Sequence, residues 1–251
     1  MTSDRTDAYF QKASKYGMLA DYYKYHNPPL HMHYYKKHLN NLQKGMLAER
    51  AAMARSEGVQ PAKIRILHAI PDGPNVDVLL NGTRVLKDFP YKKVTDYLSV
   101  PEGKYQVDVY PTGNHVSSLL SRKVNVESGK SYTVAAAGSG NKLYLQTYED
   151  KFNVPSGLTN VRFIHLSPNA GPVDVGVKGG NNLFTNVSFR KGTDYLSVYP
   201  ANVDLEVKKA GTSDVALSLP NVNLLPNTAY TVYAIGLAGD EPSLEALILV
   251  P

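Results

Sequence analysis

The sequence predicts a mainly β protein: two tandem antiparallel β-sandwich domains, preceded by an N-terminal α-helical segment. Three observations support this prediction. They are a long internal repeat, short strand patterns separated by turn residues, and a first quarter of different composition. The chain has 251 residues, which is enough for two ordinary domains.

The internal repeat is visible in two pairs of segments. Residues 64–80 read IRILHAIPDGPNVDVLL and residues 161–177 read VRFIHLSPNAGPVDVGV, and they match at an offset of 97. The hexapeptide TDYLSV at 95–100 recurs unchanged at 193–198, at an offset of 98. A nearly constant offset over such a length indicates two homologous domains. We therefore expect a helical Tyr/His-rich segment at 1–60, a first sandwich repeat at 61–157 and a second at 158–251.

Each repeat has the pattern of short β-strands. In the first repeat the run 64–68 alternates between the two faces of a strand and stops at the turn sequence 71–74. The strand pattern at 76–80 ends at Asn81-Gly82, which is a strong two-residue hairpin signal. About seven such strands fit in each repeat and no helical pattern separates them. This favours an antiparallel sandwich over a parallel sheet with crossover helices.

Residues 1–60 have a helical pattern instead. A first helix, capped by Ser3 or Asp4, is expected to end before Asn27-Pro28-Pro29, because the residue before a proline avoids the α region. A second helix is expected from about Leu30 to Ser56. Its apolar residues recur at steps of three and four: Met32, Tyr35, Leu39, Leu42, Met46 and Met53. Such a narrow a/d stripe must be covered by the first helix, by a sandwich or by another chain.

Composition excludes several kinds of site. The chain has no cysteine, which rules out disulfides, cysteine-based metal sites and cysteine nucleophiles. Residues 1–60 hold nine Lys/Arg against five Asp/Glu, so they carry +4 of the net charge of +5. We expect no nucleic-acid partner, because this charge is small. We also expect no membrane span, because no stretch of about 18 apolar residues occurs, and the N-terminus does not read as a signal peptide.

The paired motifs IRILHAIPDGPNVDVLLNG and VRFIHLSPNAGPVDVGVKGG, each followed by TDYLSV, resemble the bacterial domain-of-unknown-function family 4397. The resemblance covers about residues 61–251 in two tandem copies. It implies tandem immunoglobulin- or transthyretin-like sandwiches of the kind found on bacterial envelope or secreted proteins. It implies no known activity and supplies no catalytic residues. This sequence departs from that pattern because its N-terminus shows no evident signal peptide. Assembly into a coat layer from the cytoplasmic side, or release with a spore, would reconcile a surface location with this N-terminus.

The polar residues that recur in both repeats are predicted to be structural. They are Arg65, His68, Asp77, Asp96 and Tyr97 in the first repeat, and Arg162, His165, Asp174, Asp194 and Tyr195 in the second. A histidine at a strand end can also be a base or a metal ligand, and paired carboxylates could hold Ca²⁺ at a loop end. We predict no catalytic residue, cofactor or metal, because the sequence contains no calcium loop, phosphate loop, nucleophile elbow or zinc motif.

The unrepeated N-terminal segment is the better candidate for function. It contains seven of the 18 tyrosines and four of the seven histidines, and aromatic residues are enriched at protein interfaces. The predicted interface residues are Tyr22, Tyr23, Tyr25, Tyr34, Tyr35, Leu39, Leu42 and Met46. Two alternatives remain open: a helix pair packed on the first sandwich, or a Zn²⁺ or Cu²⁺ site. The residues of that metal site would be His26, His31, His33 and His38.

These observations together predict a non-enzymatic structural or adhesive protein of a bacterial surface layer, a spore coat being one such layer. It is expected to be made in the cytoplasm, to lie on the cell or spore surface, and to self-associate or dock onto another surface-layer protein through residues 1–60. The alternative is a pair of carbohydrate-binding modules that recognises a cell-surface or extracellular glycan. The absence of tryptophan disfavours that alternative.

Overall fold

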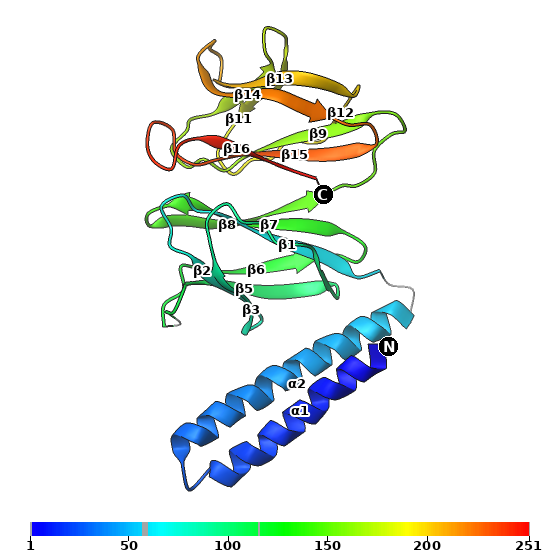
Figure 1. Ribbon diagram of the computed structural model, residues 1–251, viewed down its shortest axis with the longest axis vertical. Helices are drawn as coiled ribbons and strands as arrows, with labels where there is room; N and C mark the ends of the chain where they lie inside the picture. The colour runs from blue at the N-terminus through cyan, green and yellow to red at the C-terminus, as the bar shows by residue number, and fades with distance from the viewer. Residues whose placement is uncertain (1, 57–59, 115, 251) are drawn as a thin grey trace.

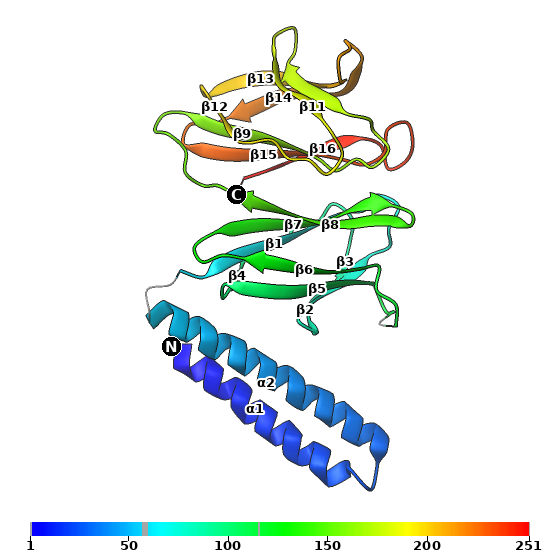
Figure 2. The ribbon, with the colours of Figure 1, turned by 180° about the vertical axis from the view of Figure 1, so that it is seen from behind.

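The computed structural model describes residues 2–56, 60–114 and 116–250, which form three parts stacked along one axis (Figure 1). A two-helix hairpin lies at one end, the first sandwich in the middle and the second sandwich at the other end. The view from behind shows the same order (Figure 2). The mainly β fold with N-terminal helices is as the sequence predicts.

Two long helices form the N-terminal hairpin. Helix α1 spans Thr2–Tyr23 and helix α2 spans Pro28–Ser56. The side-chain oxygen of Asn27 accepts the backbone N–H of Leu30 at 3.2 Å, so Asn27 is the N-cap of α2 and Pro28 takes its first position. Neither described helix has the length and hydropathy that crossing a bilayer requires.

Small residues let the two helices approach closely. Ala13 and Ala20, each about one turn from Gly17 on α1, are both buried. A Cβ atom added at Gly17 would lie 3.1 Å from the ring of His38 on α2, so a larger residue here would require that ring to shift by a few tenths of an ångström. The helix contact therefore uses a small-residue face that the hydrophobic pattern of the sequence did not reveal.

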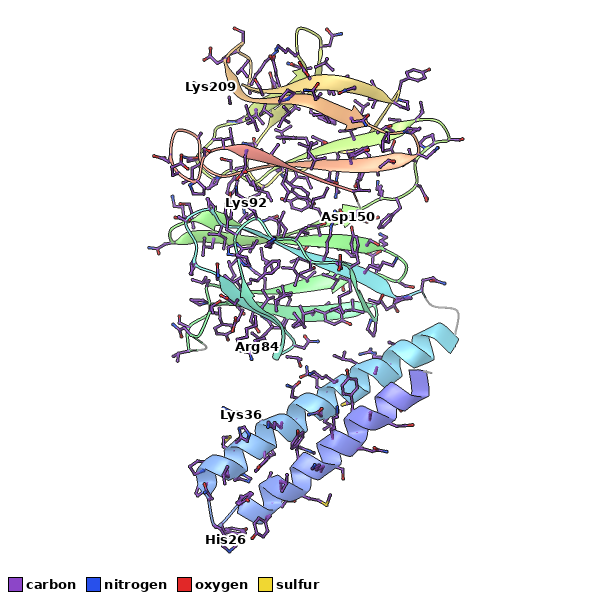
Figure 3. All side chains as sticks on the ribbon, viewed as in Figure 1. His26, Lys36, Arg84, Lys92, Asp150 and Lys209 are labelled. Atoms are coloured by element: carbon purple, nitrogen blue, oxygen red, sulfur yellow. The ribbon has the colours of Figure 1, made fainter. Side chains whose placement is uncertain are left out.

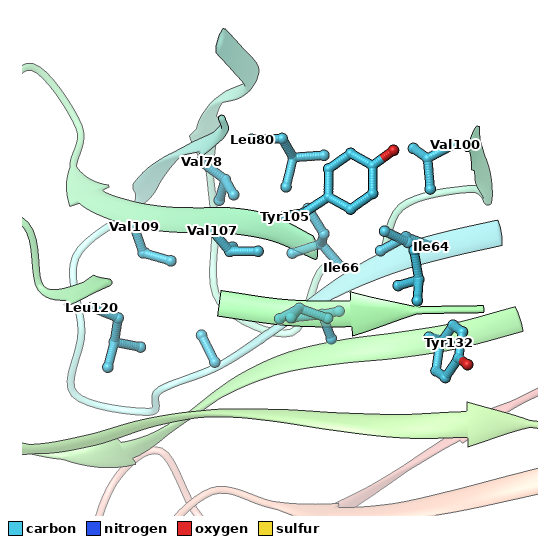
Figure 4. Packing of buried hydrophobic residues seen from close by; sticks show 14 of the residues in the cluster. Ile64, Ile66, Val78, Leu80, Val100, Tyr105, Val107, Val109, Leu120 and Tyr132 are labelled. Atoms are coloured by element: carbon cyan, nitrogen blue, oxygen red, sulfur yellow. The ribbon is translucent and has the colours of Figure 1, made fainter. Parts of the chain in front are cut away.

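The first repeat contains eight strands in two sheets. They are β1 (Ala62–Ala69), β2 (Val76–Leu80), β3 (Thr83–Phe89), β4 (Leu98–Val100), β5 (Gly103–Pro111), β6 (Leu120–Val126), β7 (Ser131–Ser139) and β8 (Lys142–Asp150). One sheet has the order β4-β1-β7-β8 and the other β3-β2-β5-β6. Buried side chains from both sheets, among them Ile64, Val78, Val107 and Tyr132, fill the space between them (Figure 4).

The second repeat has the same plan. Its strands are β9 (Thr159–His165), β10 (Val173–Val177), β11 (Asn182–Val187), β12 (Leu196–Val198), β13 (Ala201–Lys209), β14 (Val215–Leu224), β15 (Thr228–Ile235) and β16 (Glu245–Leu249). The sheets have the orders β12-β9-β15-β16 and β11-β10-β13-β14. Its own core includes Phe163, Val175 and Val207.

Two details differ from the sequence prediction. Each repeat has eight strands among the described residues, where about seven were expected, because β4 and β12 are only three residues long and leave little pattern. In addition, the central pair of one sheet in each repeat is parallel: β1 with β7, and β9 with β15. The other strand pairs given for these sheets are antiparallel.

The central strands β1, β7, β9 and β15 are buried on both faces. One face covers the core of its own repeat. The other face packs against the other repeat, since the sheet β4-β1-β7-β8 lies next to the sheet β12-β9-β15-β16 (Figure 1). Eight buried residues form the hydrophobic cluster between the two repeats: Leu67, Ala69, Ala135, Ala137, Ile164, Leu166, Tyr233 and Ile235. The two sandwiches therefore share a hydrophobic core of their own.

The hairpin is attached to the first sandwich through the side chain of Gln43. Its amide nitrogen donates to the backbone carbonyl of Asn81, and its carbonyl accepts the hydroxyl of Thr83 at 2.9 Å. Asn81 and Gly82 have positive φ angles of 48° and 76° and connect β2 to β3, which confirms the predicted hairpin turn. This attachment is local, whereas the junction between the sandwiches includes an extended hydrophobic cluster.

We predict that residues 60–251 fold without the helical segment, because both sandwich cores and the core they share lie outside it. A fragment of these residues should keep the far-UV circular dichroism of a β protein. It should unfold in one transition, within about 5 °C of the sandwich transition of the full chain. A fragment that aggregates or shows no transition would contradict this expectation.

Candidate functional site

His68 and His165 lie buried at the ends of β1 and β9. The Nε2 atom of each ring lies 3.0 Å from a backbone carbonyl, that of Pro74 for His68 and that of Gly171 for His165. The Nδ1 atom accepts a backbone N–H two residues further along, at 3.3 Å in both repeats. This arrangement requires a neutral ring with its proton on Nε2. Each histidine thus fixes the loop that follows its strand.

Asp77 and Asp174 are buried, and each accepts a hydrogen bond from the neighbouring strand at a point where the strand register shifts. The Asp77 carboxylate accepts the backbone N–H of Asp88 at 2.8 Å, and Asp174 accepts that of Asn186 at 2.7 Å. Asp88 and Asn186 have positive φ angles of 52° and 53°, and the register of each strand pair shifts at this point. The two aspartates therefore stabilise β-bulges.

Asp96 and Asp194 are exposed. They directly precede Tyr97 and Tyr195, which are both half-buried. The hydroxyl of Tyr97 donates to Asp150 at 2.6 Å, inside the junction between the repeats.

Arg65 and Arg162 point into the junction between the two sandwiches. The Nε atom of Arg65 donates to the Thr133 hydroxyl at 2.8 Å, and that of Arg162 donates to the Thr231 hydroxyl at 2.9 Å. The guanidinium carbons lie 4.9 Å and 4.6 Å from the ring centroids of Tyr97 and Tyr195. These distances allow cation–π attraction.

Each arginine also reaches across to the other repeat. Nη1 of Arg65 donates to the carbonyl of Val250 at 3.0 Å, and Nη1 of Arg162 donates to the carbonyl of Glu149 at 2.6 Å. Val250 follows β16 and Glu149 lies in β8, which are the matching edge strands of the two repeats. The cross-contacts are therefore reciprocal, as in an interface with two-fold symmetry.

Asp150 lies at the centre of this junction, where Figure 3 labels it. Its carboxylate is fully buried and forms ion pairs with both arginines, directly with Nη2 of Arg162 and at 3.6 Å from Nε of Arg65. It also accepts the hydroxyl of Thr133 at 2.6 Å. Sequence reasoning missed this residue, because Asp150 has no matching acid in the second repeat and stands outside the repeated motifs.

A second pair of basic residues, one in each repeat, also makes contacts across the junction. Lys92 in the first repeat forms an ion pair with Glu245 of β16. Arg190 occupies the matching position in the second repeat, and its guanidinium lies 3.9 Å from the ring centroid of Tyr144 on β8. The recurring residues Arg65 and Tyr97, with their counterparts Arg162 and Tyr195, therefore build the contact between the repeats.

The predicted interface residues of the N-terminal segment divide into two groups. Tyr23 and Tyr34 stack on each other within the hairpin, with ring centroids 5.7 Å apart, and Leu42 is also half-buried. The exposed residues are Tyr22, Tyr25, Tyr35, Leu39 and Met46. Met32 of the a/d stripe is exposed as well, while the side chain of Met53 lies outside the part that the structure describes.

The histidines of the hairpin do not come together. His31 and His38 each place Nδ1 at 2.8 Å from a backbone carbonyl of α1, those of Ala20 and Ala13. His26 lies at the tip of the hairpin (Figure 3). Within residues 2–56, 60–114 and 116–250, no group of three histidine or carboxylate side chains is placed to hold a metal ion.

The fold and its junction define a protein of two fused β-sandwich repeats. The model of the family described as "Domain of unknown function (DUF4397)" matches residues 62–176 and 177–250. The chain therefore belongs to this family, in two tandem segments, as its repeated motifs predicted. A comparison with curated proteins gives no match.

Two solved structures illustrate the similarity. One is a family 26 carbohydrate-binding module from Eubacterium rectale in complex with maltoheptaose, with 10% identity, a TM-score of 0.24, and coverage of 75% of this chain and 97% of that chain. The other is a candidate cell adhesion protein from Bacteroides fragilis, with 8% identity, a TM-score of 0.18, and coverage of 76% and 97%. TM-scores this low carry no argument about the function of this chain.

We predict that Asp150→Ala lowers the free energy of unfolding by about 3–5 kcal/mol, because it leaves two buried arginines without their carboxylate. Urea denaturation followed by circular dichroism measures the change. Asp96→Ala, in an exposed position, is the matched control and should change stability by less than about 0.5 kcal/mol. Equal effects of the two substitutions would show that the junction does not depend on Asp150.

We also predict that stability falls as the pH drops below neutrality. Burial lowers the pKa of His68 and of His165, and the hydrogen bond of each ring to a carbonyl acts in the opposite direction. Below the unfolded-state pKa of about 6.5 the unfolded chain binds protons that the folded chain does not. Each histidine therefore stabilises the fold above that pH, and this contribution is lost as the pH falls toward its folded-state pKa.

Urea titrations between pH 8 and pH 5 test this expectation. The loss should not exceed about 1.4 kcal/mol per pH unit for each histidine. The double variant His68→Gln with His165→Gln should be less stable at pH 8 and show a flatter pH profile, while His33→Gln on the exposed hairpin surface should leave the profile unchanged. A profile that is the same in all three proteins would contradict the assignment.

Proposed function

We propose that this chain is a non-enzymatic structural or adhesive protein of a bacterial surface layer, in which the helical hairpin joins one copy of the chain to another. The observation that carries this proposal is the exposed apolar stripe of α2. Met32, Tyr35, Leu39 and Met46 are 50%, 44%, 44% and 59% exposed. We call these four residues the α2 stripe.

The α2 stripe is a face of its own. His38 and Gly45 lie on the face of α2 that contacts α1, and Gln43 lies on the face that contacts the first sandwich. The α2 stripe faces neither α1 nor the first sandwich. Its spacing follows the a/d pattern of helices that pair with other helices. An apolar stripe of this kind on a long helix is stabilised when a second helix covers it.

A second copy of the chain fits this stripe best. Two copies of one a/d stripe can pair through the same residues around a two-fold axis, which is the commonest form of self-association. Exposed tyrosines beside it, Tyr22 and Tyr25, supply large contact area with few rotatable bonds. A neighbouring surface-layer protein covering the same stripe is the other outcome that the test below separates.

The sandwiches support a structural role in this proposal. Their recurring buried polar residues stabilise loops, bulges and the junction between the repeats, which makes the pair a stiff spacer. Location on a cell or spore surface rests on the resemblance of the motifs to those of bacterial envelope proteins, and a spore coat is one layer that such a spacer would suit.

A glycan-binding role is the second candidate, and one observation favours it. Tyr199 is 83% exposed at the end of β12, where its ring offers a flat face of the kind on which a sugar can stack. Binding on a glycan array that Tyr199→Ala abolishes, in a chain that remains monomeric, would favour this role over self-association.

We predict that the full chain self-associates in solution and that Leu39→Asp with Met46→Asp prevents it. Placing a charge on an apolar contact should raise the dissociation constant of the dimer by about tenfold or more for each substitution. Light scattering after size-exclusion chromatography measures the mass. Val116→Asp is the matched control, because Val116 is exposed on the first sandwich and does not belong to the α2 stripe.

A wild-type chain that stays monomeric at high concentration would overturn the self-association proposal. A monomeric chain that still captures a surface-layer partner through Leu39 and Met46 would assign the stripe to that partner instead. If the variant with Leu39→Asp and Met46→Asp is still a dimer, as the Val116→Asp control is expected to be, the contact lies elsewhere on the molecule.

A further inference from the structure

An apolar groove runs between the hairpin and the open side of the first sandwich. It consists of two adjoining cavities of about 460 Å³ and 260 Å³, which share Leu80, Val85 and Leu98 as lining residues. These residues belong to β2, β3 and β4, so the groove opens between the edge strands of the two sheets. Its combined size is in the range of small-molecule sites, which are about 300–1,000 Å³ and mostly apolar.

The two ends of the groove differ in polarity. Toward the sandwich core it is lined by Ile64, Ile66 and Leu86, and Figure 4 shows Ile64 and Ile66 on β1 across from Leu80. Toward the hairpin it is lined by Lys44 of α2 and by the polar residues Thr6, Thr83 and Ser99. The groove therefore offers a long apolar channel with a basic, hydrogen-bonding end.

A second cation lies near the hairpin end. Burial raises the pKa of Tyr105, which lines the groove, and the charge of Arg50 acts on it in the opposite direction. The helical segment carries most of the net positive charge of the chain. Asp96 contributes the carboxylate that lines the groove, and it lies toward the core end, away from Lys44. An anionic group would thus be placed at the hairpin end.

The second repeat is built differently at the same place. Repeat alignment and strand register put Phe163 and Phe184 where the first repeat has Ile66 and Leu86. At two other positions the second repeat has smaller side chains, with Val161 in place of Ile64 and Val177 in place of Leu80. The side-chain volume is therefore concentrated at the two phenylalanines. The hairpin that forms the basic wall occurs once, beside the first repeat. The groove is therefore a feature of the first repeat and not of the fold in general.

We propose that this groove binds a single-chain amphiphile with an anionic head group, of the long-chain fatty acid class. The acyl chain lies along Leu80, Val85 and Leu98 toward Ile66, where burial of its methylene groups supplies the affinity. The carboxylate stays at the hairpin end, where Lys44 pairs with it and the Ser99 hydroxyl donates a hydrogen bond. This site is independent of the α2 stripe, because the two use different faces of the hairpin.

Binding of tetradecanoate to the full chain, measured by displacement of a fluorescent fatty acid, tests the proposal. Tetradecanoate should bind at least about tenfold more tightly than hexanoate, because the shorter chain buries fewer methylene groups. It should also bind more tightly than tetradecyltrimethylammonium, which has the same chain and the opposite charge. Equal binding of the two charged amphiphiles would overturn the role of Lys44, and binding of neither would overturn the site.

The repeat supplies matched variants. Leu98 and Leu196 occupy the same place in TDYLSV and are 47% and 38% exposed, so glutamine at either position should leave the fold intact. Leu98→Gln should weaken tetradecanoate binding by about tenfold, and Leu196→Gln should leave it within about twofold. Ile66→Phe with Leu86→Phe, made together with Ile64→Val and Leu80→Val so that all four positions match the second repeat, should abolish binding while the circular dichroism spectrum is retained.

Two results would contradict the proposal. Equal effects of Leu98→Gln and Leu196→Gln would show that the amphiphile binds apolar surface in general. Unchanged binding in a folded variant with all four of these substitutions would place the ligand outside the groove. Because the groove variants leave the α2 stripe untouched, the mass of the same proteins by light scattering separates this result from the fate of the self-association proposal.

Discussion

The carboxylate of Asp150 is the constraint on which the arrangement of the two sandwiches depends. It is fully buried and is shared by two arginines, one from each repeat. Charges removed from water destabilise a protein unless they are paired and hydrogen-bonded. Arg65 and Arg162 meet that condition only when the repeats lie in the observed orientation, because Asp150 and the carbonyls of Glu149 and Val250 come together there.

This junction explains features of the fold that a single sandwich does not need. A sheet with one solvated face would show alternating apolar and polar residues. β7 and β15 instead contain runs such as Val134 to Ala137 and Tyr230 to Ile235, in which successive side chains cover the core of one repeat and the face of the other. The same double burial gives the parallel pairs at the sheet centres no contact with solvent. The repeats therefore act as one body with three hydrophobic cores.

The helical hairpin differs from the sandwiches because part of its apolar surface is not buried within the chain. Its helices contact each other partly through small residues, Ala13, Gly17 and Ala20, and several large apolar side chains of α2 remain available for other contacts. One set forms the α2 stripe, proposed to join copies of the chain. Another set forms a wall of the apolar groove, proposed to hold an acyl chain. A stiff double sandwich and an adaptable hairpin thus divide support from recognition.

The sequence by itself determined the local structure and the repeat. Period-two patterns, the turn at Asn81-Gly82 and the proline pair after Asn27 depend on neighbours in the chain, so the strands, the hairpin turn and the two helices were predictable. The duplication of His68 and Asp77 also led us to predict a structural role for both residues. Only the tertiary structure decided what lies against what: that Arg65 and Arg162 share Asp150, that β1 pairs in parallel with β7, and that the α2 stripe faces away from α1. These are contacts between residues far apart in the chain, and their energy depends on burial and orientation, which no local pattern records.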